Sequence, residues 1–162
     1  MNWLKDLFFD LILNFPLVCT AAGWFFAQVC KVFVGVFRDK NYHIIALFVS
    51  TGGMPSAHTS SVTALAAACA LSEGLNSAAF AVAAVLTVVV MRDAPGVRRE
   101  VGEQAKVLNG MKKKLAAMEG KPQEEALLES VGHSNLEVFI GCAVGLVVPF
   151  IMGLIPAFGI FF

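Results

Sequence analysis

Charged residues are scarce in this chain. Of its 162 residues, 15% are charged and 57% are hydrophobic, whereas a soluble domain carries about 25% charged and about 45–50% apolar residues. This shortage argues against a soluble domain and predicts a polytopic membrane protein, and the length indicates a single domain, 1–162. The formal net charge is zero. The overall charge therefore points to no partner, and we expect no nucleic acid.

The chain also lacks a cysteine pattern that could hold a metal ion or a redox centre. Its four cysteines lie in apolar segments and have neither CxxC nor metal-ligand spacing: Cys19, Cys30, Cys69 and Cys142. We interpret them as small buried hydrophobic residues and expect neither a metal nor a cofactor. We also expect no cleavable signal peptide, because Lys5 near the N-terminus is offset by Asp6 and Asp10.

Long apolar runs are what the sequence has in excess. A membrane-crossing helix needs about 20 mostly apolar residues. Four segments meet or approach this length: 15–37, 56–72, 76–92 and 136–162. The second and third are rich in alanine, whose small side chain lets membrane helices approach closely, so we expect both in the middle of a bundle. The predicted fold is an all-α, polytopic membrane helical bundle with four to five membrane helices.

Segment 93–134 is the one long polar region. Apolar residues recur in it every three or four positions, the period of an amphipathic helix: Val97, Val101, Ala105, Leu108, Met111, Leu115 and Met118. The other side of this helix carries basic residues: Arg98, Arg99, Lys106, Lys112, Lys113 and Lys114. Because basic residues concentrate on the cytoplasmic side of a membrane, we predict that 93–134 is a cytoplasmic amphipathic helical insertion in the membrane domain.

The same rule places a short polar motif on that face. Counting spans back from the basic segment, the motif "TGGMPSAHTSS", 51–61, also faces the cytoplasm. Helix N-termini attract anions through their free N–H groups. Gly53 lets the backbone approach a ligand closely, and Ser56 adds a hydroxyl donor. We interpret the motif, with His58, as an anion-binding helix start. The alternative is a glycine turn with a serine cap and an incidental interfacial histidine.

Basic side chains elsewhere could join this motif. Arg98 and Arg99 carry guanidinium groups suited to phosphate oxygens, and Asp93, an expected helix start, is included in the candidate binding set. The alternative for the arginines is a basic face that contacts anionic lipid headgroups. Lys31 lies inside the first apolar span, where a charge is costly and usually faces a polar interior. The alternative interpretation of Lys31 is that its side chain snorkels to the membrane interface.

A second histidine precedes the fourth apolar segment. Glu137 follows His133 by about one helical turn, and a carboxylate bonded to an imidazole fixes its tautomer and raises its basicity, as a nucleophile requires. The alternative is that Ser134 and Glu137 form a capping box, S-x-x-E, which only closes the helix. Together the candidates suit phosphoryl chemistry: cations hold the phosphate oxygens, one histidine attacks and the other protonates the leaving oxygen.

Three blocks of sequence carry a family resemblance. "GGMPSAHTSSVTALA", "DAPGVRREVGEQAKVLN" and "GHSNLEVFIG" resemble the signature blocks of the divergent type 2 phosphatidic acid phosphatase family, also called acid phosphatase/vanadium-dependent haloperoxidase-related. The resemblance implies that His133 is a nucleophile that forms a phosphohistidine and that Glu137 orients it. It implies that His58 is the acid that protonates the leaving alkoxide. Arg98 or Arg99, and more loosely Lys31, would bind the phosphate.

Three interpretations of function stay open. The first is a membrane-embedded, metal-independent lipid phosphatase that hydrolyses a phospholipid or isoprenoid phosphate monoester or pyrophosphate. The second is a non-catalytic membrane protein that binds or transports an anion or lipid phosphate. The third is a structural membrane protein whose basic helix contacts anionic lipids. We expect an integral protein of a bacterial cytoplasmic membrane with its site facing the cytoplasm. We also expect a homodimer, since four or five helices rarely enclose a polar site alone.

Overall fold

The computed structural model describes residues 3–37, 53–93, 96–119, 125–127 and 134–161, and for 97–99 and 119 it describes the backbone. Helices are the only regular elements in these ranges: α1 (Trp3–Leu13), α2 (Phe15–Phe37), α4 (Ala57–Glu73), α5 (Ala78–Asp93), α6 (Val97–Glu119), α7 (Asn135–Gly153) and the 3₁₀ helix η1 (Pro156–Phe158). The predicted all-α fold is confirmed.

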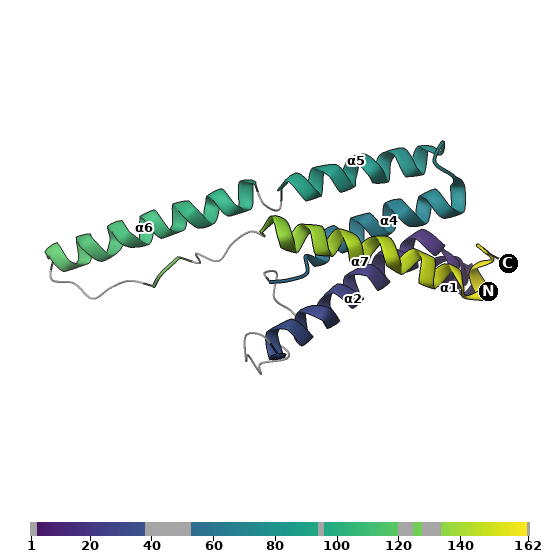
Figure 1. The fold of residues 1–162 in the computed structure, drawn as a ribbon, viewed down its shortest axis with the longest axis horizontal. Coiled ribbons are helices and arrows are strands. Elements are labelled where there is room, and N and C mark those ends of the chain that lie inside the picture. The colour runs from purple at the N-terminus through teal and green to yellow at the C-terminus, as the bar shows by residue number, and fades with distance from the viewer. Residues whose placement is uncertain (1–2, 38–52, 94–95, 120–124, 128–133, 162) are drawn as a thin grey trace.

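Helix α4 is the centre of the bundle. It packs against α2, α7 and α5, and α2 also contacts α7 (Figure 1). The central place expected for the alanine-rich segment 56–72 is therefore confirmed. The same expectation for 76–92 is wrong, because α5 packs chiefly against α4 and Ala83 is its one buried residue. Its valines point outward instead, as those of a helix at the edge of a bundle do.

Small residues spaced four apart let the central helices touch. A Cβ atom at Gly23 of α2 would lie 2.9 Å from the Cβ of Ala64 on α4. A Cβ at Gly141 of α7 would lie 2.5 Å from the carbonyl oxygen of Ser56. Backbones this close favour packing and interhelical hydrogen bonds in membrane proteins. One such bond joins α4 to α2, where Ser60 Oγ donates to the carbonyl oxygen of Gly23 at 2.8 Å.

Two helices in the described ranges are long and apolar enough to cross a membrane, namely α2 and α7. The 17 residues of α4 and the 16 of α5 make helices about 26 and 24 Å long at about 1.5 Å per residue. Both fall short of the roughly 30 Å hydrocarbon core. The predicted four to five membrane helices are thus not confirmed, although α4 lies between the two candidate spans.

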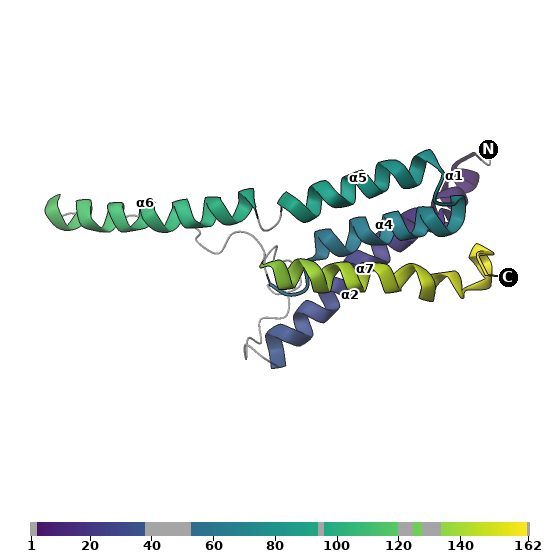
Figure 2. The same cartoon turned by 45° about the horizontal axis from the view of Figure 1, so that its top comes forward.

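Helix α6 projects from the bundle as an arm (Figures 1 and 2). Its 23 residues extend about 34 Å at about 1.5 Å per residue. The amphipathic helix predicted in the polar segment is confirmed, but Asp93 ends α5 instead of starting the next helix, which begins at Val97. On the returning chain, the side chain of Asn109 bonds both backbone groups of Leu127, at 2.9 and 2.8 Å.

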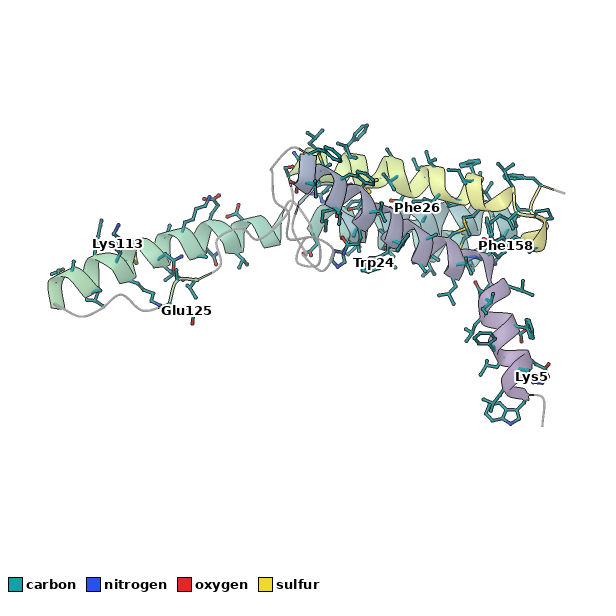
Figure 3. All side chains as sticks on the ribbon, turned by 90° about the horizontal axis from the view of Figure 1, so that it is seen from below. Lys5, Trp24, Phe26, Lys113, Glu125 and Phe158 are labelled. Atoms are coloured by element: carbon teal, nitrogen blue, oxygen red, sulfur yellow. The ribbon has the colours of Figure 1, made fainter. Side chains whose placement is uncertain are left out.

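The opposite end of the bundle holds both chain termini. There α1 turns away from α2 (Figure 3) and buries no residue. Between them, Asn14 Oδ1 accepts a hydrogen bond from the backbone N–H of Leu17 at 3.0 Å, near the start of α2. The chain after α7 folds back, so that the ring of Phe158 meets that of Phe15 edge to face with centroids 5.3 Å apart. This apolar closure leaves the polar motifs at the other end.

Candidate functional site

The three sequence blocks meet at one end of the bundle. The C-terminal ends of α2 and α5 and the N-terminal ends of α4, α6 and α7 all lie there (Figures 1 and 2). Each block contains a helix start: α4 and α7 begin where polar residues precede an apolar run, and the amphipathic α6 begins after a Pro-Gly pair. Segments that are far apart in the sequence thus bring their polar residues to the same end of the structure.

The start of α4 is fixed against the first turn of α7. The backbone N–H of Ser56 donates to the carbonyl oxygen of Glu137 at 3.0 Å. Ser56 is completely buried, and its Oγ accepts hydrogen bonds from the backbone N–H of Thr59 at 3.4 Å and from its Oγ1 at 3.1 Å. Ser56 is therefore the N-cap of α4, as the alternative interpretation of the motif expected. A contact between Ser56 and substrate stays a prediction.

Lys31 is buried at this junction. It is 3% exposed, and its aliphatic stem passes beneath Gly53, where an added Cβ would lie 3.7 Å from Lys31 Cγ and 3.8 Å from Cδ. Gly53 has φ +88°, a conformation that favours glycine. Lys31 interacts electrostatically with Glu137, and the amide of Gln28, one turn earlier, is buried on the same helix. Lys31 therefore lies in the bundle interior, as predicted, and does not snorkel.

The carboxylate of Glu137 takes part in the cap of α7. Its Oε2 accepts a hydrogen bond from the backbone N–H of Ser134 at 3.0 Å, and Ser134 Oγ accepts one from the N–H of Glu137 at 3.3 Å. These two bonds form the capping box that the sequence offered as an alternative. The box thus fixes Ser134, the residue that follows His133 in the sequence, at the start of α7. The same carboxylate also supplies the negative charge near Lys31.

His58 lies on another side of α4. It is in the first turn and its side chain is exposed, whereas its neighbours Ala57 and Thr59 are buried. The helical period places His58 on the same face as Val62, whose carbonyl oxygen accepts a hydrogen bond from Thr87 of α5 at 2.9 Å. His58 thus lies on a different side of α4 from the bond that joins Ser56 to α7.

Three predicted site residues lie partly or wholly outside the described part. His133 is outside it, and Arg98 and Arg99 are described as backbone in the first turn of α6. Their predicted roles stay predictions. Asp93 is half-buried at the last position of α5. Within the ranges that are described, no group of three or more His, Cys, Asp and Glu side chains could hold a metal ion.

Sequence reasoning missed the residues that bring the helices together. Gly141 and Gly145 approach α4, and a Cβ at Gly145 would lie 2.8 Å from Thr63 Cβ. The Oγ1 of Thr63 is buried there and has no hydrogen-bond partner among the described residues. The four-residue spacing of glycines in α7 was a readable signal for such a contact. Their partners on α4 could not be read from this spacing, because it is local to one helix.

Comparison with known proteins agrees with these blocks. The model of the Divergent PAP2 family matches residues 12–148, which include all three blocks. The chain is also similar to an uncharacterized membrane protein, YuiD, of Bacillus subtilis (strain 168), with 39% identity over 153 residues, which are 88% of this chain and 96% of that protein. No solved structure matches the chain significantly. The family resemblance read from the sequence is confirmed, and this chain is a membrane protein of the Divergent PAP2 family.

Proposed function

We propose that this protein is a membrane-embedded, metal-independent lipid phosphatase. Its substrate would be a phospholipid or isoprenoid phosphate monoester or pyrophosphate. The observation that carries the proposal is a buried lysine, Lys31, held beside the N-terminal ends of α4 and α7 in a protein of the Divergent PAP2 family. A charge in a membrane helix is costly and usually serves a polar interior site. An anionic phosphate at this site would offset that cost.

The proposed reaction is a double displacement. A nitrogen of His133 forms a bond to phosphorus while the bond from phosphorus to the lipid oxygen breaks, and His58 donates a proton to that leaving oxygen. Water then attacks the phosphohistidine and releases phosphate. General acid catalysis of this kind contributes about 10²–10⁴-fold. Lys31, Arg98 and Arg99 would stabilise the charge on the phosphoryl oxygens, as cationic side chains do in phosphoryl transfer.

The capping box gives Glu137 a specific part in this reaction. Its bond to the N–H of Ser134 fixes the residue that follows His133. Glu137 would then act as a positioning residue through the cap of α7 and by holding a negative charge near Lys31. A direct bond from Glu137 to the imidazole is the alternative expected from the resemblance.

The test is phosphate release from purified protein in lipid nanodiscs. We expect hydrolysis of phosphatidic acid or phosphatidylglycerophosphate that chelator does not reduce and that His133→Ala abolishes. The remaining histidine offers a matched control, His43→Ala, which should keep activity. Full activity in His133→Ala would exclude the phosphohistidine mechanism.

A non-catalytic binding or transport protein is the second candidate. The observation that favours it is that a carboxylate oxygen of Glu137 already accepts a bond within the capping box, which leaves it less free to orient a nucleophile. This function predicts that phosphate-containing lipids bind without turnover and that Arg98→Ala weakens the binding. Measuring binding and phosphate release on the same preparation separates the two candidates.

The proposed topology places α2, α4, α5 and α7 in a bacterial cytoplasmic membrane, with the polar end facing the cytoplasm. The α6 arm would then lie on the membrane surface, where its exposed apolar side chains, such as Met111 and Leu115, meet lipid and its lysines meet anionic headgroups. A homodimer is part of this proposal. With the native cysteines removed, a cysteine at Lys113 should be protected from an impermeant reagent applied outside intact cells. A cysteine at Leu75, in the turn between α4 and α5, should react.

A further inference from the structure

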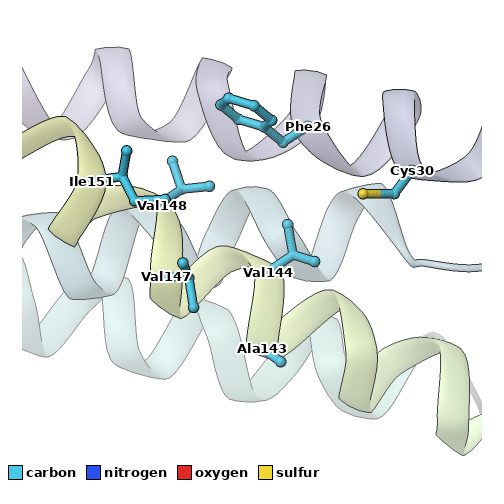
Figure 4. Close-up of a pocket in the computed structure, with 7 residues that line it drawn as sticks. All are labelled: Phe26, Cys30, Ala143, Val144, Val147, Val148 and Ile151. Carbon is cyan, nitrogen blue, oxygen red and sulfur yellow. The ribbon is translucent and has the colours of Figure 1, made fainter.

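An open apolar groove of about 340 Å³ runs between α2 and α7 (Figure 4). Its accessible lining is entirely apolar and includes Phe26, Cys30, Ala143, Val144, Val147 and Ile151. Pockets that hold small ligands have volumes of about 300–1,000 Å³. Both of its helices are candidate membrane spans, so the groove opens toward the hydrocarbon of a bilayer.

One end of the groove lies toward the polar site along both of its helices. Cys30 precedes Lys31 in α2, and Ala143 lies six residues after Glu137 in α7, which is less than two helical turns. The other end, at Phe26 and Ile151, lies farther toward the apolar closure of the bundle. The groove therefore follows α7 from Ala143 to Ile151, a rise of about 12 Å at about 1.5 Å per residue.

We propose that this groove binds one acyl or prenyl chain of a lipid whose anionic headgroup lies at Lys31. The inference deepens the proposed function and rests on it for the identity of the headgroup. An apolar lining suits a hydrocarbon chain, and the buried ammonium at one end suits a phosphate. A helix from a second copy is about 10–12 Å across with its side chains, which is too wide to enter a groove of this volume. A phosphate-bearing lipid is thus the occupant that fits both the apolar lining of the groove and the basic residue Lys31 beyond one end of it.

Photocrosslinking tests the groove without requiring turnover. The full-length protein is placed in phosphatidylcholine nanodiscs with a phosphatidic acid that carries a diazirine in its acyl chain, and the labelled peptides are mapped. We expect labels at Phe26, Cys30 and 143–151, at least 10-fold above the outer face of α5 at Val82 and Val85. We also expect unlabelled phosphatidic acid to compete and phosphatidylcholine to compete at least 10-fold less. Equal labelling of both faces would overturn the proposal.

A pair of variants tests whether the acyl chain of the lipid lies in the groove. Val147→Trp fills the groove, and Leu146→Trp places the same side chain on an exposed position of α7 outside the lining. We expect Val147→Trp to reduce the groove labels at least 10-fold and Leu146→Trp to leave them within 2-fold. If Val147→Trp does not fold, Val147→Ala should still shift the labels by enlarging the groove. Unchanged labels in both Val147 variants would contradict the inference.

Turnover then separates this inference from the proposed function. With active enzyme, Val147→Trp should raise the KM for a long-chain substrate at least 10-fold and leave a short-chain, water-soluble phosphate unaffected. Specific groove labels without any phosphatase activity would support lipid binding in the groove and contradict the proposed phosphatase function. Phosphatase activity with uniform labels would contradict lipid binding in the groove and support the phosphatase function. Phosphatase activity with Cys30–Cys30 crosslinks between two copies, in place of groove labels, would do the same.

Discussion

Helix α4 meets its neighbours differently on its two sides. Toward α2 and α7 it presents buried serine, threonine and alanine, and glycines of both partners bring the backbones into contact. Toward α5, α4 meets an outer helix whose one buried residue is Ala83 and whose Thr87 donates a hydrogen bond to the carbonyl oxygen of Val62. Beyond α5 the α6 arm leaves the bundle (Figure 1). The tight side holds the buried Lys31 and the bond from Ser56 to Glu137, and the other side carries His58 and leads to the start of α6. The candidate site thus combines closely packed, buried residues between α2, α4 and α7 with the exposed His58 on another side of α4.

Removing the buried ammonium of the tight side should have the largest effect. We expect Lys31→Met to lower kcat/KM for a lipid phosphate about 10²–10³-fold, the loss seen when one stabilising donor is removed from an active site. The matched control is Lys113→Met on the arm, which should lower it less than 2-fold. If Lys113→Met loses activity and Lys31→Met keeps it, the site belongs to the α6 arm and not to the packed helices α2, α4 and α7.

Filling a glycine contact on the tight side should come next. A Cβ at Gly145 would lie 2.8 Å from Thr63 Cβ and 3.1 Å from the backbone nitrogen of Ala64, and overpacking of this kind costs about 1–3 kcal/mol. Thermal unfolding in detergent should show a lower midpoint for Gly145→Ala.

The arm offers the control for this change. A Cβ at Gly110 would meet no atom within 4 Å, and alanine within a helix is favoured over glycine by about 0.5–1 kcal/mol. Gly110→Ala should therefore keep or raise the midpoint. Equal midpoints for the two glycine variants would show that the α4–α7 contact is not the stabilising one.

The capping box should produce a smaller change. Ser134→Ala removes the N-cap hydroxyl and should destabilise the protein by about 0.5–2 kcal/mol. Glu137→Gln keeps a capping oxygen and removes the charge near Lys31, so it should preserve stability. The activities of the two variants then separate the two roles of Glu137. A loss of kcat confined to Glu137→Gln shows that Glu137 acts through its charge. A similar loss of kcat in both variants assigns it to the cap that precedes α7.

The smallest effect should appear on the arm. Asn109→Ala removes the bond that the N–H of Leu127 donates to Asn109 Oδ1. A net hydrogen bond contributes about 0.5–1.5 kcal/mol, so hydrogen exchange at Leu127 should become about 2- to 10-fold faster. The amide of Ser56, bonded to Glu137 in the bundle, should exchange as in the wild type. Faster exchange at both amides would indicate that local opening at the α6 arm also opens the contact between α4 and α7.

The sequence predicted much of this architecture because its signals are local. Hydrophobic runs located α2 and α7, the three-to-four period located α6, and S-x-x-E located the cap of α7. The buried place of Lys31 followed from the cost of a charge in an apolar span. Each of these inferences depends on residues within one helix.

Contacts between distant segments were not readable in this way. The edge position of α5 depends on which helices cover α4, and the alanine content of 76–92 is equally compatible with the centre. The groove between α2 and α7 requires that Cys30 meet residues more than 110 positions later in the chain. The separation of His58 from Ser56 around α4 depends likewise on where α5 and α7 pack.

The most direct test of the account is to trap the enzyme during turnover with a lipid phosphate and map the phosphorylated peptide by mass spectrometry. The account predicts an acid-labile phosphate on His133 in the wild type, none in His133→Ala, and slower formation in Lys31→Met. Phosphate release without a phosphorylated intermediate, or with phosphate on another residue, would contradict it.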